Sequence, residues 1–179
     1  MSIYIHLPSE KRLKQLKVGK PDVRPAFTEI YRTSVTLNAP LNFVYDWCTD
    51  FQSDDLQLIG SKNSRNIHEK SKKRVIWTVE GMKLPLGTEP VRVVWLRPPD
   101  AWHLETCGDG FETGEYKLTA MGNKKTRLDM TFTETNRSRA ALQSREDYIG
   151  ETIEHWKHYG KQLEMDYQKS LRGTKVGRA

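Results

Sequence analysis

Residues 35–48, VTLNAPLNFVYDWC, contain the change of periodicity that decides the fold. Before this stretch, from Phe27 to Leu37, apolar residues alternate with polar ones, which is typical of a half-buried strand. Asn38-Ala39-Pro40 ends the strand, and proline is well suited to the first turn of a helix. Apolar side chains then recur at helical spacing, at Leu41, Val44, Tyr45 and Cys48. We predict a helix from Pro40 to about Asp50, followed by a short second helix or loop over 51–60.

Alternating patterns continue after this helix and predict an antiparallel meander. The pattern indicates strands over Arg65–Lys70, Lys73–Met82 and Glu89–Leu96, with Val91, Val93 and Trp95 expected on one face. Three further strands are expected around Trp102–Thr106, Tyr116–Ala120 and Leu128–Phe132. Asp109-Gly110 is a strong hairpin signal between the first two of these three.

The spacing of apolar residues changes again after Asn136: from Leu142 to Tyr167 they recur at intervals of seven, four and three residues. This spacing predicts one long amphipathic helix, with Ser144 near its start and Gly173 at its end. Its apolar stripe lies on one side only, so we expect the helix to pack against the sheet.

The composition places limits on the class of protein. The chain has 179 residues, five Trp, seven Tyr and two Cys. It contains no apolar run of membrane-spanning length and no disulfide framework, which argues against a membrane channel, a collagen, a coiled coil or a disulfide-stapled miniprotein. No apolar signal region follows Met1, so we expect a cytoplasmic protein with no transmembrane segment and with free thiols.

Basic residues give the chain a net charge of +6, and they are concentrated in segments. We expect a basic N-terminal arm over 1–25, one domain over 26–172 and a basic C-terminal tail over 173–179. A further basic cluster covers 61–74, whereas 105–116 is acidic. No nucleic-acid-binding motif accompanies the charge, so we do not expect nucleic acid as a partner. The sequence is compatible with a homodimer.

The order of elements resembles the START and polyketide-cyclase superfamily (SRPBCC, helix-grip), which includes birch-pollen-allergen-like proteins. The resemblance covers about residues 27–172 and rests on residues 35–40 leading into Val44–Trp47, on Asp50-Phe51, on Pro98-Pro99 before Trp102, and on Thr126-Arg127-Leu128. Lys125 stands where the family usually has glycine. The fold class expected is therefore α+β, a curved antiparallel sheet wrapped around a long C-terminal helix, with a short helix pair after the first strand.

Members of this superfamily mostly bind hydrophobic small molecules between the sheet and the long helix, and some cyclise or dehydrate the bound chain. The resemblance thus implies binding of a hydrophobic or aromatic molecule, such as a lipid, an isoprenoid or a polyketide-like compound. A cyclase or dehydratase is the first alternative, and whether the chain is an enzyme stays open. A module that docks on RNA, membrane or protein through its basic segments is the second alternative.

Strand and helix faces predict the residues that would line such a cavity, with Tyr159 or His155 orienting a polar group of the ligand. The same residues would equally form an ordinary packed core, and the sequence leaves both interpretations open. The predicted ligand-binding residues are Trp77, Val79, Val93, Trp95, Trp102, Tyr116, Leu118, Met130, Phe132, Ile153, His155, Trp156 and Tyr159.

Polar residues offer few catalytic candidates, and no catalytic residue is assigned. Glu89, Thr106, Glu112 and Glu134 share the parity of the apolar set and are expected at its open rim, although a deeply buried carboxyl group could act as a general acid or base. His155 and His158 are spaced like two metal ligands. They match neither a His-Glu-x-x-His motif nor a pair of Glu-x-x-His helices, so we expect no metal and no cofactor.

Overall fold

The computed structural model describes residues 27–82, 89–107, 111–136, 139 and 142–173. The predicted N-terminal arm, most of the predicted C-terminal tail and the Asp109-Gly110 turn lie outside the described residues. Within the described part, each predicted strand is present and the predicted long helix is present.

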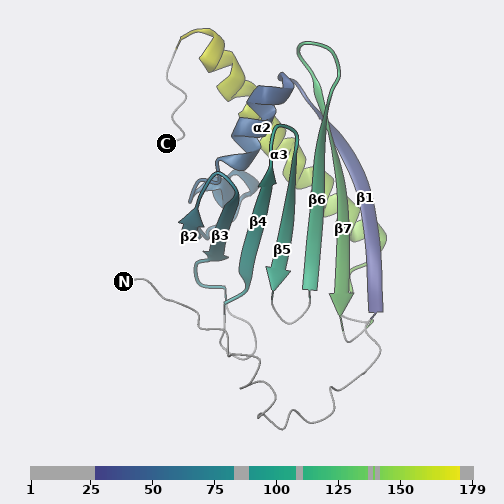
Figure 1. Cartoon of the computed structure of the whole chain (residues 1–179). Coiled ribbons are helices and arrows are strands. Elements are labelled where there is room, and N and C mark those ends of the chain that lie inside the picture. The colour runs from purple at the N-terminus through teal and green to yellow at the C-terminus, as the bar shows by residue number, and fades with distance from the viewer. Residues whose placement is uncertain (1–26, 83–88, 108–110, 137–138, 140–141, 174–179) are drawn as a thin grey trace.

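Two α-helices, one short 3-10 helix and seven strands make up the described part of the chain (Figure 1). In chain order they are β1 (Phe27–Leu37), α2 (Leu41–Thr49), η1 (Asp55–Ile59), β2 (Arg65–Lys70), β3 (Arg74–Val79), β4 (Val91–Arg97), β5 (Ala101–Cys107), β6 (Phe111–Ala120), β7 (Thr126–Asn136) and α3 (Arg145–Leu171).

The strands form one curved antiparallel sheet in the order β1-β7-β6-β5-β4-β3-β2. The first strand of the chain therefore pairs with the last, and Tyr31 lies opposite Phe132 in their register. Figure 1 shows α3 crossing behind the sheet, with α2 beside its C-terminal half. This arrangement confirms the expected α+β helix-grip fold.

The turn between β1 and α2 is tied to the sheet by a buried hydrogen bond. Leu37, the last residue of β1, lies opposite Thr126, the first residue of β7. The Thr126 hydroxyl is buried and donates to the Ala39 carbonyl oxygen at 2.9 Å. Two of the motifs that carried the resemblance, 35–40 and 126–128, are therefore in direct contact, which explains why they occur together.

Helix α3 begins and ends where its sequence signals predicted. Ser144 is the N-cap, and its hydroxyl oxygen accepts from the Asp147 backbone N–H at 3.2 Å. Acidic Glu146 and Asp147 occupy the first turn, where they complement the helix dipole. Gly173 follows the helix with a positive φ of 70°, a conformation that favours glycine.

A buried polar contact holds α3 to α2. The Trp47 indole Nε1 donates to Asp166 Oδ2 at 3.0 Å, and Gln162 Nε2 donates to Asp166 Oδ1 at 2.9 Å. Asp166 is only 1% exposed, and Leu163, one turn earlier, is fully buried. Gly160 lies close to Leu37 of β1, where an added Cβ would be 3.4 Å from the leucine methyl group.

Val91, Val93 and Trp95 of β4 share a face as expected, but the prediction that Val93 and Trp95 face the cavity was wrong. Val94 is buried, whereas Trp95 is 38% exposed and lies under the Arg74 guanidinium. Apolar residues occur at both parities of this strand, so its own alternation is ambiguous. The register resolves the ambiguity, because the inward-facing Trp102 and Leu104 of β5 lie opposite Leu96 and Val94. Val93 and Trp95 therefore belong to the outer face.

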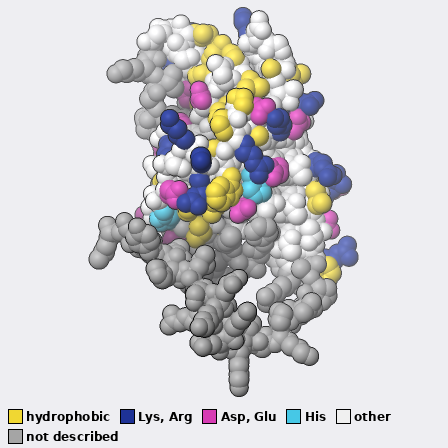
Figure 2. Space-filling model, viewed as in Figure 1, with side chains coloured by type: hydrophobic (Ala, Val, Ile, Leu, Met, Phe, Trp, Pro, Cys, Tyr) yellow, Lys and Arg dark blue, Asp and Glu magenta, His cyan; other side chains and the backbone are white. Residues whose placement is uncertain are grey.

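Charges on the outer face of the sheet are largely paired. Figure 2 shows Lys, Arg, Asp and Glu side chains interspersed over this face. Among the described residues, the ion pairs include Arg97–Glu115, Lys117–Asp100 and Arg127–Asp129. The described part of this face is therefore not a continuous basic surface.

The buried Trp47–Asp166 contact predicts a specific loss of stability. Replacing Trp47 with Phe removes the indole donor and leaves a buried carboxylate oxygen with one hydrogen bond fewer. We expect W47F to lower the free energy of unfolding by about 2 kcal/mol in urea titrations. The matched variant W95F changes an exposed tryptophan and should cost less than about 1 kcal/mol. Equal losses in the two variants would contradict this role for Asp166.

Candidate functional site

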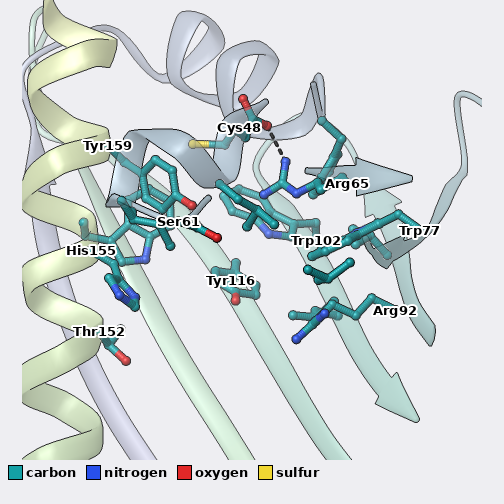
Figure 3. Close-up of a pocket in the computed structure, with 18 of the residues that line it drawn as sticks. Cys48, Ser61, Arg65, Trp77, Arg92, Trp102, Tyr116, Thr152, His155 and Tyr159 are labelled. Carbon is teal, nitrogen blue, oxygen red and sulfur yellow. Dashed lines mark hydrogen bonds and ion pairs between the residues drawn. The ribbon is translucent and has the colours of Figure 1, made fainter. Parts of the chain in front are cut away.

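A cavity of about 490 Å³ lies between the inner face of the sheet, the α2–η1 segment and α3. Figure 3 shows side chains converging on it from α3 on one side and from the strands on the other. Trp77, Trp102 and Tyr116 come from the sheet, whereas Trp156 and Tyr159 come from α3. Most of the lining surface is apolar.

The structure brings eight of the thirteen predicted residues together around this cavity. They are Trp77, Val79, Trp102, Tyr116, Phe132, His155, Trp156 and Tyr159.

The other five predicted residues lie elsewhere. Leu118 and Met130 are each 1% exposed and belong to the packed core, away from the cavity wall. Ile153 is half-buried on α3 but does not line the cavity. Val93 and Trp95 are on the outer face of the sheet, as described above. The inner face therefore divides into a filled core and a hollow part, a division that strand parity alone cannot predict.

Stacked aromatic rings form the centre of the sheet wall. The Trp102 and Tyr116 rings lie parallel with centroids 4.9 Å apart, and Phe132 meets Tyr116 edge-on at 5.6 Å. Gly114 makes this arrangement possible, because a Cβ there would lie 2.8 Å from the Tyr116 ring. Burial raises the pKa of Tyr116, so its hydroxyl stays protonated and can donate a hydrogen bond.

The α2–η1 segment covers one end of the cavity, a contribution that the sequence analysis missed. Trp47 and Cys48 reach the cavity from α2, and Leu56 and Ile59 reach it from η1. Their apolar spacing was visible in the sequence, but the same spacing also fits packing onto the core.

Two arginines, also missed, flank Trp77 in the cavity wall. The Arg65 and Arg92 guanidinium carbons lie 4.7 Å and 4.8 Å from the centroid of the Trp77 ring. In Figure 3 Trp77 lies between Arg65 above and Arg92 below. The sequence could have identified Arg92 if the inward face of β4 had been assigned from the neighbouring strands, because Arg92 lies opposite the inward-facing Trp77.

Arg65 is held by a buried ion pair. Its Nη1 donates to Asp55 Oδ2, and each of the two side chains is 10% exposed. Asp55 Oδ2 also accepts from the Gln52 backbone N–H at 3.0 Å. The pair joins β2 to η1, so it holds η1 in place over this end of the cavity.

The four predicted rim residues occupy different environments. Glu89 is exposed, whereas Thr106, Glu112 and Glu134 are half-buried. Tyr148 of α3 donates to Glu112 Oε1, and Tyr31 of β1 donates to Glu134 Oε2 at 3.1 Å. These carboxylates are held by phenol groups and do not line the cavity.

The two phenols of this cluster have raised pKa values. Burial, with the nearby charge of Glu134, raises the pKa of Tyr31 to about 12. Burial also raises the pKa of Tyr148, and the charge of Glu112 adds to the effect. The Tyr31 and Tyr148 rings stack with centroids 4.2 Å apart, so the cluster fastens the first turn of α3 to the sheet.

The described residues contain no group of three His, Cys, Asp or Glu side chains that could hold a metal ion. His155 lines the cavity, whereas His158 lies 3.6 Å from Glu154. Among the residues that the structure describes, no helix combines the length and the apolar character needed to cross a membrane.

Comparisons with known proteins find the fold but no sequence relative. No family model matches the chain, and no curated protein matches it. Among solved structures, the Zhui aromatase/cyclase from Streptomyces sp. R1128 is similar with a TM-score of 0.58 and 12% identity, over 86% of this chain and 100% of that one.

Two further structures define the same class. Norcoclaurine synthase from Thalictrum flavum, in complex with dopamine and hydroxybenzaldehyde, matches with a TM-score of 0.56 and 9% identity over 78% of this chain and 88% of that one. A START superfamily protein from Mycobacterium smegmatis matches with a TM-score of 0.55 and 16% identity, over 76% of this chain and 97% of that one. The chain thus has the fold of START and cyclase proteins.

The raised tyrosine pKa values predict alkaline unfolding. The ordinary pKa of tyrosine is 10.0, and the folded values of Tyr31, Tyr116 and Tyr148 are higher. Above pH 10 the unfolded chain therefore loses protons that the folded chain retains, so the free energy of unfolding falls as pH rises. We expect part of the tyrosinate absorbance to emerge only as near-ultraviolet circular dichroism is lost. Complete titration near pH 10 in the folded protein would contradict this prediction.

Proposed function

We propose that this chain binds a hydrophobic or aromatic small molecule in the cavity between the sheet and α3. The observation that carries the proposal is the cavity itself, about 490 Å³ bounded by Trp77, Trp102, Tyr116 and Trp156. Ligand pockets commonly have volumes of about 300–1,000 Å³ and are lined by aromatic side chains with a few polar groups. The alternative of a wholly packed core accounts for Leu118 and Met130 but leaves this volume unexplained.

Burial of apolar surface would supply most of the affinity, at about 25 cal/mol per Å². The aromatic wall is suited to flat or chain-like molecules, because its rings are fixed by their mutual stacking. Hydroxyl groups at Tyr116 and Tyr159, and the His155 ring, lie on the wall and could orient a polar group of the ligand.

The solved structures of similar fold support this proposal at the level of the fold. Norcoclaurine synthase was captured with dopamine and hydroxybenzaldehyde, two small aromatic molecules. The identity of 9% is too low to transfer that ligand to this chain. A lipid, an isoprenoid or a polyketide-like compound is therefore proposed only as a class.

Catalysis of cyclisation or dehydration is the second candidate, because the wall is not purely apolar. His155 lines the cavity, and an imidazole ring is a common general acid or base in catalysis. However, its side chain is exposed, and Glu112, the other acid–base candidate, is bonded to Tyr148 and does not line the wall. Binding is thus better supported than turnover.

Native mass spectrometry of the freshly purified protein tests the proposal directly. We expect an added mass that denaturing extraction releases as an apolar compound. A mass equal to that of the polypeptide, unchanged after addition of lipids, isoprenoid quinones and polyketide mimics, would contradict a ligand-binding function. The second alternative, docking through the basic segments, would then be tested by the salt dependence of RNA and anionic vesicle binding.

A cavity-filling substitution tests the location of the site. Leu104 lines the cavity from β5, so L104W should occupy part of the volume and weaken binding of an apolar fluorescent probe about tenfold or more. The control V91W adds the same side chain at a position on β4 that is 37% exposed. We expect its probe affinity to match the parent protein, with similar thermal unfolding in both variants. Equal weakening in the two variants would place the probe elsewhere.

A further inference from the structure

Arg92 is a cation in the cavity wall without a bonded anion. Its side chain extends from the inner face of β4, opposite Trp77 of β3 in the register. Its Nη1 atom is buried, and among the described residues no oxygen accepts a hydrogen bond from it. Burial lowers the pKa of the Arg92 guanidinium, yet an arginine stays charged in proteins. A buried, charged donor of this kind is costly unless something binds it.

Two neighbours of Arg92 also have buried polar atoms without partners. Trp77, Arg92 and Thr106 lie opposite one another on β3, β4 and β5 and form a single row across the inner face. The Trp77 Nε1 and Thr106 Oγ1 atoms are buried, and among the described residues neither has a hydrogen-bond partner. Trp77 and Arg92 of this row line the cavity, whereas Thr106 does not. The indole N–H and the guanidinium are therefore the two donors of the row that belong to the cavity wall.

Nearby carboxylates are already engaged. Asp55 pairs with Arg65, on the other side of Trp77 in Figure 3. Glu112 continues the row beyond Thr106, but it accepts from Tyr148 and forms no ion pair with Arg92 in the described structure. Among the described residues, the cavity wall thus contains two arginines and one bonded carboxylate. Glu112 attracts Arg92 from outside the wall, but it forms no ion pair that would occupy the guanidinium.

We propose that the ligand is an amphipathic anion whose carboxylate or phosphate group binds Arg92 beside Trp77, while its apolar part lies along the aromatic wall. This inference rests on the ligand-binding function proposed above and narrows the ligand class. The guanidinium supplies planar paired donors that match a carboxylate or a phosphate. From Arg92 the wall continues through Trp102 and Tyr116 toward α3, so one molecule can contact both parts.

Three linear probes with the same number of carbon atoms test the proposal: dodecanoate, dodecyl phosphate and the uncharged dodecanol. Each is titrated at neutral pH in competition with an apolar fluorescent probe. We expect at least one of the two anions to bind the parent protein about tenfold or more tighter than dodecanol. Whichever anion binds better indicates whether a carboxylate or a phosphate is preferred.

Variants assign that preference to a residue. R92L should abolish the preference for the anion over dodecanol, whereas R92K should keep part of it. The control R97L removes an exposed arginine of the same strand, paired with Glu115 on the outer face, and should keep the full preference. E112Q removes the nearby carboxylate charge, so the anion should bind as tightly as before or tighter.

The outcomes separate this inference from the function on which it rests. Dodecanol bound as tightly as both anions by the parent protein would overturn the anion site and leave hydrophobic binding intact. An anion preference that persists in R92L would also overturn it. If none of the three probes binds, both proposals fail. Because the comparison of anion with alcohol uses the parent protein, the test stands even if R92L does not fold.

Discussion

A buried carboxylate is stable only where its oxygens accept hydrogen bonds, and Asp166 meets this condition inside the junction of α2 and α3. The indole of Trp47 supplies one of these bonds, so the end of the long helix is fixed against the short helix. Since α2 follows directly from β1, the same contact sets the position of α3 over the sheet. The cavity lies between these elements and the sheet, and Trp47, which makes this contact, is also part of its lining.

Most of the fold could be predicted because the apolar residues switch clearly between the alternation of a strand and the spacing of a helix. The bounds of α3 followed from Ser144 and Gly173, and the strands followed from alternation. The inward face of β4 could not be predicted from β4 alone, since it is apolar at both parities. Assignment needed the neighbours: once Trp77 and Trp102 face inward, the register requires Arg92 and Leu96 to do the same.

The candidate site was predicted less completely than the fold, for a related reason. Strand parity separates inner from outer residues but does not separate hollow from filled regions of the inner face. Met130 and Phe132 share a strand and a face, yet only Phe132 reaches the cavity. The distinction depends on how far α3 and η1 stand from each strand, which is a property of the packed structure and leaves no local signal.

The distribution of charge across the sheet supports the importance of Arg92. On the outer face, cations such as Arg97 and Lys117 have carboxylates beside them and remain in contact with water. On the inner face, Arg65 also has a carboxylate, and the pair closes one end of the cavity. Arg92 differs from both groups, because it is largely removed from water and, among the described residues, Glu112 attracts it without forming an ion pair. A leucine at this position would extend the apolar wall and avoid burying a charge, at the loss of the attraction to Glu112. The buried guanidinium therefore supports the proposal of a ligand that carries a negative charge.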